Sequence, residues 1–187
     1  MKIPEFVNIP ADGLLKIDAP ATDSYRSYNL AWELTQKGKF DEALAQYQKG
    51  LERMPKYASS ADLATVYDYM GRARAGKGDM AAAVRDFEKA TRLNPSFGPH
   101  LYDYALALTQ LNRFDEAQTA VEAALKANAD FAEAHELPGG LYGRKRRLPE
   151  AAREYRRALD LRPDVSAKMR PHGLNSGHAC LVGSSLL

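Results

Sequence analysis

The stretch Gly38-Lys39-Phe40-Asp41-Glu42-Ala43 decides the fold, because variants of it return three more times along the 187 residues. The related stretches are Gly78-Asp79-Met80-Ala81-Ala82-Ala83, Asn112-Arg113-Phe114-Asp115-Glu116-Ala117 and Arg146-Arg147-Leu148-Pro149-Glu150-Ala151. Their final alanines lie at positions 43, 83, 117 and 151, so the spacings are 40, 34 and 34 residues. Self-similarity at such a period predicts an array of small structural units that bury their apolar faces against each other.

Other residue types recur in register with these alanines. Small residues lie twelve positions before and seven positions after each of them, where two helix axes must approach closely. An aromatic residue lies four positions after three of them, and a proline lies twelve positions after three of them. The two small sites hold Ala31, Gly71, Ala105 and Gly139, and Gly50, Ala90, Ala124 and Ala158; the aromatic site holds Tyr47, Phe87, Val121 and Tyr155; the proline site holds Pro55, Pro95, Ala129 and Pro163.

Each unit shows two stretches with apolar residues at helical spacing, which predicts a pair of amphipathic helices. Gly38, Gly78 and Asn112 suit the left-handed residue that ends a first helix. The acidic residues of Asp41-Glu42 and Asp115-Glu116 suit the start of a second helix, where the helix dipole favours negative charge. The prolines twelve positions on would end the second helices.

This pattern resembles the tetratricopeptide repeat (TPR) family over residues 24–163. The resemblance implies an all-α fold, a right-handed α-α superhelical solenoid of TPR helix pairs. We expect repeats at about 24–57, 64–97, 98–131 and 132–165. Pentatricopeptide repeats, which bind RNA, are the nearest alternative, but they lack this pattern of small residues and prolines.

The long first interval holds six extra residues around Lys56 to Leu63. Ser59 and Asp62 have the spacing of a capping box, with Asp in place of the usual Glu. We interpret the insertion as an early start of the first helix of repeat two, and a longer loop is the alternative.

Repeat four departs from the pattern. Pro138 follows a candidate helix cap at Asp130 and occupies a helix-interior site, so it should kink or end that helix. Gly139 and Gly140 weaken the helix further, and Arg146 occupies a turn site that glycine or asparagine fills more easily. The sequence therefore predicts that repeat four is the least stable unit.

The two ends lie outside the repeat pattern. Residues 1–23 form a non-repeat segment or linker whose prolines indicate extended and turn-rich structure. Residues 166–187 are expected to form a mobile tail, with Pro171 and Gly173 stopping any helix that begins near Ser166. The apolar end of repeat four would then be uncapped, so it could self-associate or contact an adjoining domain, while loose folding back of the tail is the alternative.

The charge balance and the hydrophobic pattern limit the classes of partner that we expect. With 26 Lys+Arg and 24 Asp+Glu, the net charge of +2 gives no general attraction to nucleic acid or to anionic membranes. The sequence lacks the roughly 18–20 consecutive apolar residues of a membrane helix and a signal-peptide pattern, so a cytoplasmic location is the default expectation. We expect a protein or peptide partner.

Candidate chemistry is sparse, so we predict that the chain is not an enzyme and uses no catalytic residue, cofactor or metal. His172, His178 and Cys180 fall in the expected mobile tail, which cannot fix ligand geometry. His100 and His135 are expected on the surface near helix starts. The basic run 144–147 spans a turn, where charges are normally solvated; a nucleic-acid or import role is the alternative.

The resemblance implies that the first helix of each repeat lines a concave groove. The groove residues carried onto this sequence are Tyr25, Tyr28, Trp32, Asp68, Arg72, Tyr102 and Leu106. The aromatics would bind a partner peptide, since such residues recur at binding hot spots; packing of the aromatics against residues 1–23 is the alternative. Asp68 and Arg72 are four residues apart and would pair with each other or orient the peptide.

Some TPR domains hold a ligand's terminal carboxylate with a clamp of basic and amide side chains. The matching sites here are Tyr28, Trp32, Tyr69, Pro99 and Asp103, none of them basic, so the resemblance does not extend to that ligand class. We therefore expect a non-enzymatic interaction scaffold that binds a partner peptide in its concave groove. The alternative is a structural, assembly or spacer module, or a fragment of a larger, enzymatic multidomain protein.

Overall fold

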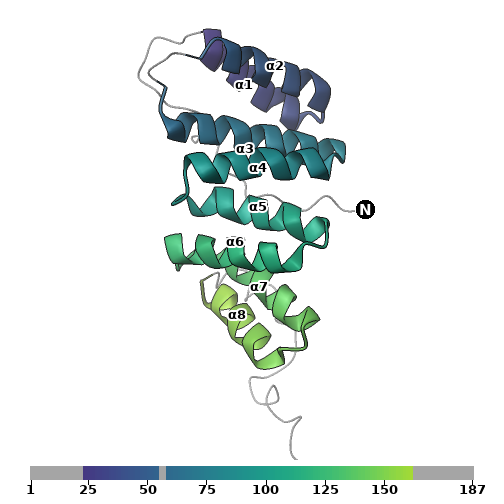
Figure 1. The fold of residues 1–187 in the computed structure, drawn as a ribbon, viewed down its shortest axis with the longest axis vertical. Helices are drawn as coiled ribbons and strands as arrows, with labels where there is room; N and C mark the ends of the chain where they lie inside the picture. The colour runs from purple at the N-terminus through teal and green to yellow at the C-terminus, as the bar shows by residue number, and fades with distance from the viewer. Residues whose placement is uncertain (1–22, 55–57, 162–187) are drawn as a thin grey trace, which may run out of the picture.

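The computed structural model describes residues 23–54 and 58–161, and these residues form eight α-helices and no strand (Figure 1). The helices are α1 (Asp23–Gln36), α2 (Phe40–Glu52), α3 (Ser60–Lys77), α4 (Met80–Leu93), α5 (Gly98–Gln110), α6 (Phe114–Ala127), α7 (Ala132–Arg144) and α8 (Leu148–Leu161). The calls for residues 1–22 and for the tail after position 161, including His172, His178 and Cys180, lie outside the described residues.

The helices pack as successive pairs. The most extensive contacts join α1 with α2, α3 with α4, α5 with α6 and α7 with α8, and each pair also contacts the next. Figure 1 shows the pairs stacked along one long axis from α1 to α8. The predicted all-α helical repeat solenoid is confirmed.

Small residues set the spacing within the pairs. A Cβ atom at Gly71 would lie 2.8 Å from two carbons of the Phe87 ring on α4, which is closer than real Cβ contacts. A Cβ atom at Gly139 would lie 3.0 Å from the Tyr155 ring on α8. The aromatic ring of the second helix therefore lies directly on the backbone of the first helix in these two pairs.

Each first helix ends in one left-handed residue. The φ angles are +72° at Gly38, +92° at Gly78, +60° at Asn112 and +55° at Arg146. These positions recur in register, so the same turn joins the helices of all four pairs. Three of them carry the glycine or asparagine that this conformation favours, and Arg146 does not.

The early helix start in repeat two is confirmed. The Ser59 hydroxyl accepts a hydrogen bond from the Asp62 amide at 3.1 Å, and the Ser59 amide donates to the Asp62 carboxylate at 3.0 Å. This reciprocal pair is a capping box, in which the shorter Asp side chain replaces the usual Glu.

Pro138 was expected to kink or end its helix, and it does not end it, because α7 continues from Ala132 to Arg144. The candidate cap Asp130 is also wrong. The N-cap residue is Phe131, and the Asp130 carboxylate accepts from Arg157 of α8 at 2.8 Å instead. Pro138 is buried, and tertiary packing outweighs local propensity here.

Hydrogen exchange tests the predicted weakness of repeat four. Pro138 removes a helix hydrogen bond, and Gly139 and Gly140 add conformational entropy to the unfolded chain. Amides of residues 132–145 should therefore exchange faster than those of α3 and α5. Equal protection across the three helices would contradict this expectation.

A second test concerns the left-handed residue of repeat four. Arg146→Gly should raise the free energy of unfolding by about 1 kcal/mol, because glycine adopts a positive φ without steric strain. Gly78→Arg, the converse change at the matching position, should lower it by about 1–2 kcal/mol. Urea unfolding of both variants checks the pair, and a destabilised Arg146→Gly protein would refute the strain argument.

Candidate functional site

The predicted groove residues lie on the first helices of repeats one to three. Trp32 on α1 and Leu106 on α5 are partly exposed. The other five are buried: Tyr25 and Tyr28 on α1, Asp68 and Arg72 on α3, and Tyr102 on α5. The predicted set thus divides into two side chains with accessible surface and five that form the layer beneath.

The two tyrosines of α1 pack against each other and against α2. The Tyr25 and Tyr28 rings meet edge to face with centroids 6.2 Å apart. Tyr28 also lies against the backbone of α2, where a Cβ atom at Gly50 would clash with its ring. Burial, followed by the nearby Tyr25, raises the pKa of Tyr28 well above its usual range. Tyr28 therefore holds the first helix pair together.

Trp32 belongs to a row of aromatic and cationic groups that crosses from α1 to α3. Its ring centroid lies 4.9 Å from that of Tyr69. Tyr69 is fixed from two other sides, by the Tyr47 ring of α2 at 6.4 Å and by the Arg72 guanidinium carbon at 5.7 Å. The Trp32 ring is therefore presented on an ordered support.

A buried ionic cluster joins α3 to α5. Arg72 Nε donates to Asp68 Oδ2 at 2.8 Å, and Arg72 Nη2 lies 2.5 Å from Asp103 Oδ2. His100 Nδ1 lies 3.2 Å from the other Asp68 oxygen. Both carboxylates are fully buried, so the guanidinium supplies the charge that they need in a water-poor setting. Of the two alternatives for Asp68 and Arg72, the structure shows that they pair.

The electrostatics of Arg72 reflect this position. Burial alone lowers the pKa of its guanidinium, but the Asp68 and Asp103 carboxylates outweigh burial, and the net pKa is raised. Arg72 therefore stays charged and links the second and third repeats.

The expected surface positions of His100 and His135 are wrong. His100 is 1% exposed and lies against Phe97, with ring centroids 4.6 Å apart. His135 is 8% exposed, and its ring nitrogens contact Glu154 of α8 at 2.8 Å and the Ala129 carbonyl at 3.0 Å. A usable signal was the repeat register: Val66 and Ala134 match His100, and Leu101 matches His135, and these apolar residues are all buried.

Tyr102 and Leu106, the two predicted groove residues of α5, pack against the later repeats. The Tyr102 ring lies 5.3 Å from that of Phe131, which precedes α7. Leu106 stands one turn further along α5 and packs beside the core of the later repeats. Asp103, which sequence reasoning considered only as a clamp site, completes the ionic cluster with Arg72 and Asp68.

A separate hollow of about 390 Å³ opens where α2, α3 and α4 meet. At its edge, Arg74 Nη1 lies 2.7 Å from Asp86 Oδ2, and the Lys89 ammonium lies 4.9 Å from the Tyr67 ring centroid. Burial raises the pKa of Asp86, while Arg74 opposes that rise. The hollow has a paired ionic lining rather than unpaired functional groups.

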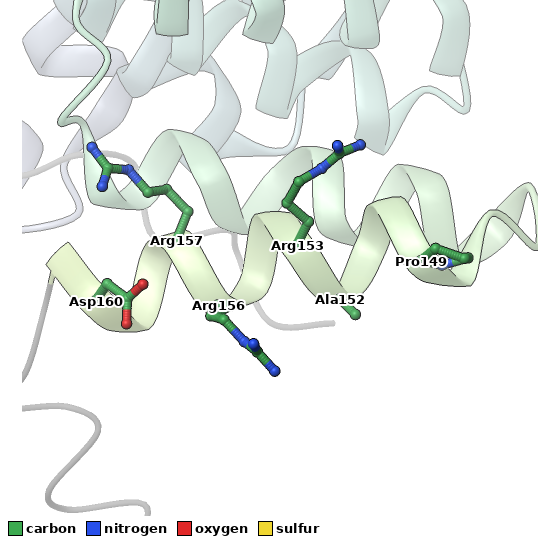
Figure 2. A pocket seen from close by; sticks show the side chains of 6 residues that line it. All are labelled: Pro149, Ala152, Arg153, Arg156, Arg157 and Asp160. Carbon is green, nitrogen blue, oxygen red and sulfur yellow. The ribbon is translucent and has the colours of Figure 1, made fainter. Parts of the chain in front are cut away.

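A second hollow, of about 450 Å³, lies along α8 and is lined by Pro149, Ala152, Arg153, Arg156, Arg157 and Asp160 (Figure 2). Arg156 points away from Arg153 and Arg157 in this view.

Three of the four basic residues in the run 144–147 contact acidic or aromatic side chains of this chain. Lys145 pairs with Asp115 at 2.8 Å, Arg147 pairs with Glu150 at 2.9 Å, and the Arg144 guanidinium lies 5.0 Å from the Phe114 ring centroid. Lys145 and Arg144 therefore contact repeat three, whereas Arg147 pairs within repeat four.

Within residues 23–54 and 58–161, no group of three or more His, Cys, Asp or Glu side chains has the arrangement of a metal site. In the same part of the chain, no helix combines the length and apolar character needed to cross a bilayer.

Comparison with known proteins identifies the family. Models described as tetratricopeptide repeat match residues 74–137 and 27–57. The chain belongs to the tetratricopeptide repeat family, whose members with this fold are generally protein-interaction modules.

Solved structures agree on the fold. A crystal structure of MamA is 22% identical over 84% of this chain and 86% of MamA, with a TM-score of 0.67. YrrB, described as a TPR protein with an unusual peptide-binding site, is 19% identical over 78% of this chain and 74% of its own, with a TM-score of 0.63. The first TPR of Spaghetti (RPAP3), bound to the HSP90 peptide SRMEEVD, is 21% identical over 61% of this chain and 93% of its own, with a TM-score of 0.55.

The ionic cluster predicts a large response to one substitution. Arg72→Met should destabilise the fold by about 3–5 kcal/mol, because two buried carboxylates lose their counter-charge. Adding Asp68→Asn and Asp103→Asn should recover part of this loss, since neutral amides carry no charge to be compensated. Urea unfolding measures both, and a triple variant weaker than Arg72→Met alone would contradict the charge argument.

Proposed function

We propose that the chain is a non-enzymatic scaffold that binds a peptide segment of a partner protein in the concave groove of its first helices. The groove residues are Tyr25, Tyr28, Trp32, Asp68, Arg72, Tyr102 and Leu106. Membership of the TPR family supports the general role in protein interaction. The observation that carries the groove proposal is the partly exposed Trp32 ring on its ordered support of Tyr69 and Arg72.

The seven residues have two roles in this proposal. Trp32 and Leu106 offer apolar surface to the partner and bury it on binding. The three tyrosines and the Asp68–Arg72 pair lie beneath. Arg72 also joins α3 to α5 through Asp103. A rigid support lowers the ordering cost of binding.

The neighbouring groove positions indicate the chemistry of the segment. The partly exposed positions that the resemblance assigns to the groove on α1, α3 and α5 are uncharged, and they include Thr35, Thr65, Pro99 and Thr109. An apolar or uncharged segment suits repeats one to three. The RPAP3 repeat binds the acidic peptide SRMEEVD, but the five clamp sites of this chain carry no basic side chain. We therefore propose that this chain does not bind that peptide.

Selection from a displayed random-peptide library on the immobilised chain tests the groove. Selected peptides should lose about 30-fold in affinity when Trp32 is replaced by alanine, because truncating a hot-spot aromatic costs about 2 kcal/mol. The Trp32→Ala, Tyr102→Ala double variant should bind still more weakly. Isothermal titration with each purified variant gives the dissociation constants.

Tyr67→Ala is the matched control. Tyr67 is a partly buried aromatic in the hollow between α2 and α3, so its removal tests for general loosening of the fold. The affinity of the Tyr67→Ala variant for the peptides should stay within about twofold of wild type. A few hot-spot residues carry most of the binding energy, and positions outside them contribute little. Unchanged binding by Trp32→Ala, or tight binding of SRMEEVD, would overturn the proposal.

The second candidate function is a structural or assembly module. The observation that favours it is the exposed apolar surface of the last helix, where Leu148, Tyr155 and Leu159 are exposed. Self-association through this end is part of that candidate. A cytoplasmic location belongs to both proposals and rests on the sequence alone.

A further inference from the structure

The last helix carries an apolar stripe that its own repeat does not cover. Leu148, Ala152, Tyr155 and Leu159 follow one another at spacings of four, three and four residues, so they share one face of α8. Leu148 is 65% exposed, Tyr155 is 46% exposed and Leu159 is 41% exposed. Tyr155 reaches Gly139 with its ring edge but leaves much of its surface open.

The same stripe is covered at each of the three joins inside the array. The matching residues are Phe40, Leu44, Tyr47 and Leu51 on α2; Met80, Val84, Phe87 and Thr91 on α4; and Phe114, Gln118, Val121 and Leu125 on α6; all twelve are buried or partly buried. Phe40 lies against Gly76 near the end of α3, and Phe114 lies beneath Arg144 at the end of α7. The first helix of the following repeat therefore covers this face.

The other end of the array presents the complementary face. Leu30 on α1 is 45% exposed, whereas Met70, its match on α3, is 5% exposed and lines the hollow with Gln48 and Leu51 of α2. The next match, Tyr104 on α5, is partly buried and packs against the core that includes Val84 and Phe87 of α4. Leu30 thus occupies the position that contacts a preceding second helix, and no such helix precedes it among the described residues.

We infer that two copies of this chain stack head to tail, with α1 of one copy covering the exposed stripe of α8 of the next. The contact continues the join that the array already makes three times, so its geometry is built into both ends. Leu30 would lie on Leu159 and Leu148 on Gln36, as Met70 lies by Leu51 and Phe40 lies on Gly76. This inference goes beyond the groove proposal and does not depend on it.

An ion pair at two of the three internal joins marks the register, and the α4–α5 join holds Ala81 and Leu111 at the same positions. Lys77 Nζ lies 2.5 Å from Asp41 Oδ1, and Lys145 Nζ lies 2.8 Å from Asp115 Oδ1 at the matching positions. The Lys145 ammonium lowers the pKa of Asp115, as expected for a carboxylate with a nearby cation. In the stacked pair the matching positions hold Lys37 and Pro149, so the lysine is present and the carboxylate is missing.

The two surfaces differ, so the contact is heterologous and does not close on itself. Association should therefore produce a chain of copies that lengthens with concentration, rather than a dimer of fixed size. The self-association of the full chain should weaken when either end alone carries a charge.

Sedimentation velocity of the full chain and two end variants tests the inference. Wild type should show a weight-average mass that rises continuously with concentration. Leu30→Arg blocks the first end and Leu148→Arg blocks the last, and each should remain monomeric. Both sites are exposed, so the fold should persist, which circular dichroism checks. An equimolar mixture should form a heterodimer that does not grow, because each variant keeps one working end.

Ala81→Arg is the control, since it adds the same charge at an exposed position of α4. It should associate as wild type does. A monomeric wild type at every concentration would overturn the inference, and this result would also fit an end covered by another segment of the chain. Association that survives Leu30→Arg would indicate pairing of two α8 faces and would equally overturn it.

A gain of affinity tests the register independently. Pro149→Asp supplies the missing carboxylate opposite Lys37 of the next copy and should lower the dissociation constant about two- to fivefold at low salt. The gain should vanish in the Pro149→Asp, Lys37→Gln double variant. Ala81→Asp, the matching change inside the array, should leave association unchanged. A Pro149→Asp protein with unaltered association would refute the proposed register.

Discussion

The structure depends on how closely two helices can approach where one of them lacks a bulky side chain. At Gly71 the Phe87 ring occupies the space that a Cβ atom would need, and at Gly139 the Tyr155 ring does the same. Each contact places an aromatic ring against the backbone of the first helix and sets the spacing of its helix pair. The pairs then present similar faces to one another, so one mode of stacking serves the whole array.

Stacking alone does not determine how the first helices of successive repeats are joined. Helices α3 and α5 are tied by a buried guanidinium between two carboxylates, and this arrangement requires side chains from both repeats. Such a cluster is costly to bury unless its charges are paired, so it holds the two helices in one relative position. The Trp32–Tyr69 contact adjoins this cluster, and the rigidity of the proposed binding surface follows from it.

The sequence was sufficient for features that repeat and insufficient for features that occur once. The repeated turn stretch predicted the left-handed residues at Gly38, Gly78, Asn112 and Arg146, because one backbone geometry is required four times. The capping box at Ser59 was also predictable, since its two hydrogen bonds are local.

The partner of His100 and the second partner of Arg72 were not predictable, because Asp68 reaches His100 and Asp103 reaches Arg72 from the neighbouring repeat, and no local spacing encodes either contact. The prediction for Pro138 also depended on local sequence alone. Local propensity disfavours proline inside a helix, but burial against neighbouring elements holds α7 in one piece. The groove residues themselves came from family resemblance, and the sequence could not show that five of the seven are buried.

The double-mutant cycle of Gly71 and Phe87 tests the role of close approach most directly. Gly71→Ala should lower the free energy of unfolding in the wild-type chain, although alanine favours a helix interior by about 1 kcal/mol over glycine. In a Phe87→Leu background the same change should cost much less or become stabilising, because the smaller side chain leaves room for the Cβ atom. If Gly71→Ala stabilises both backgrounds equally, contact between ring and backbone does not set the spacing of the helices.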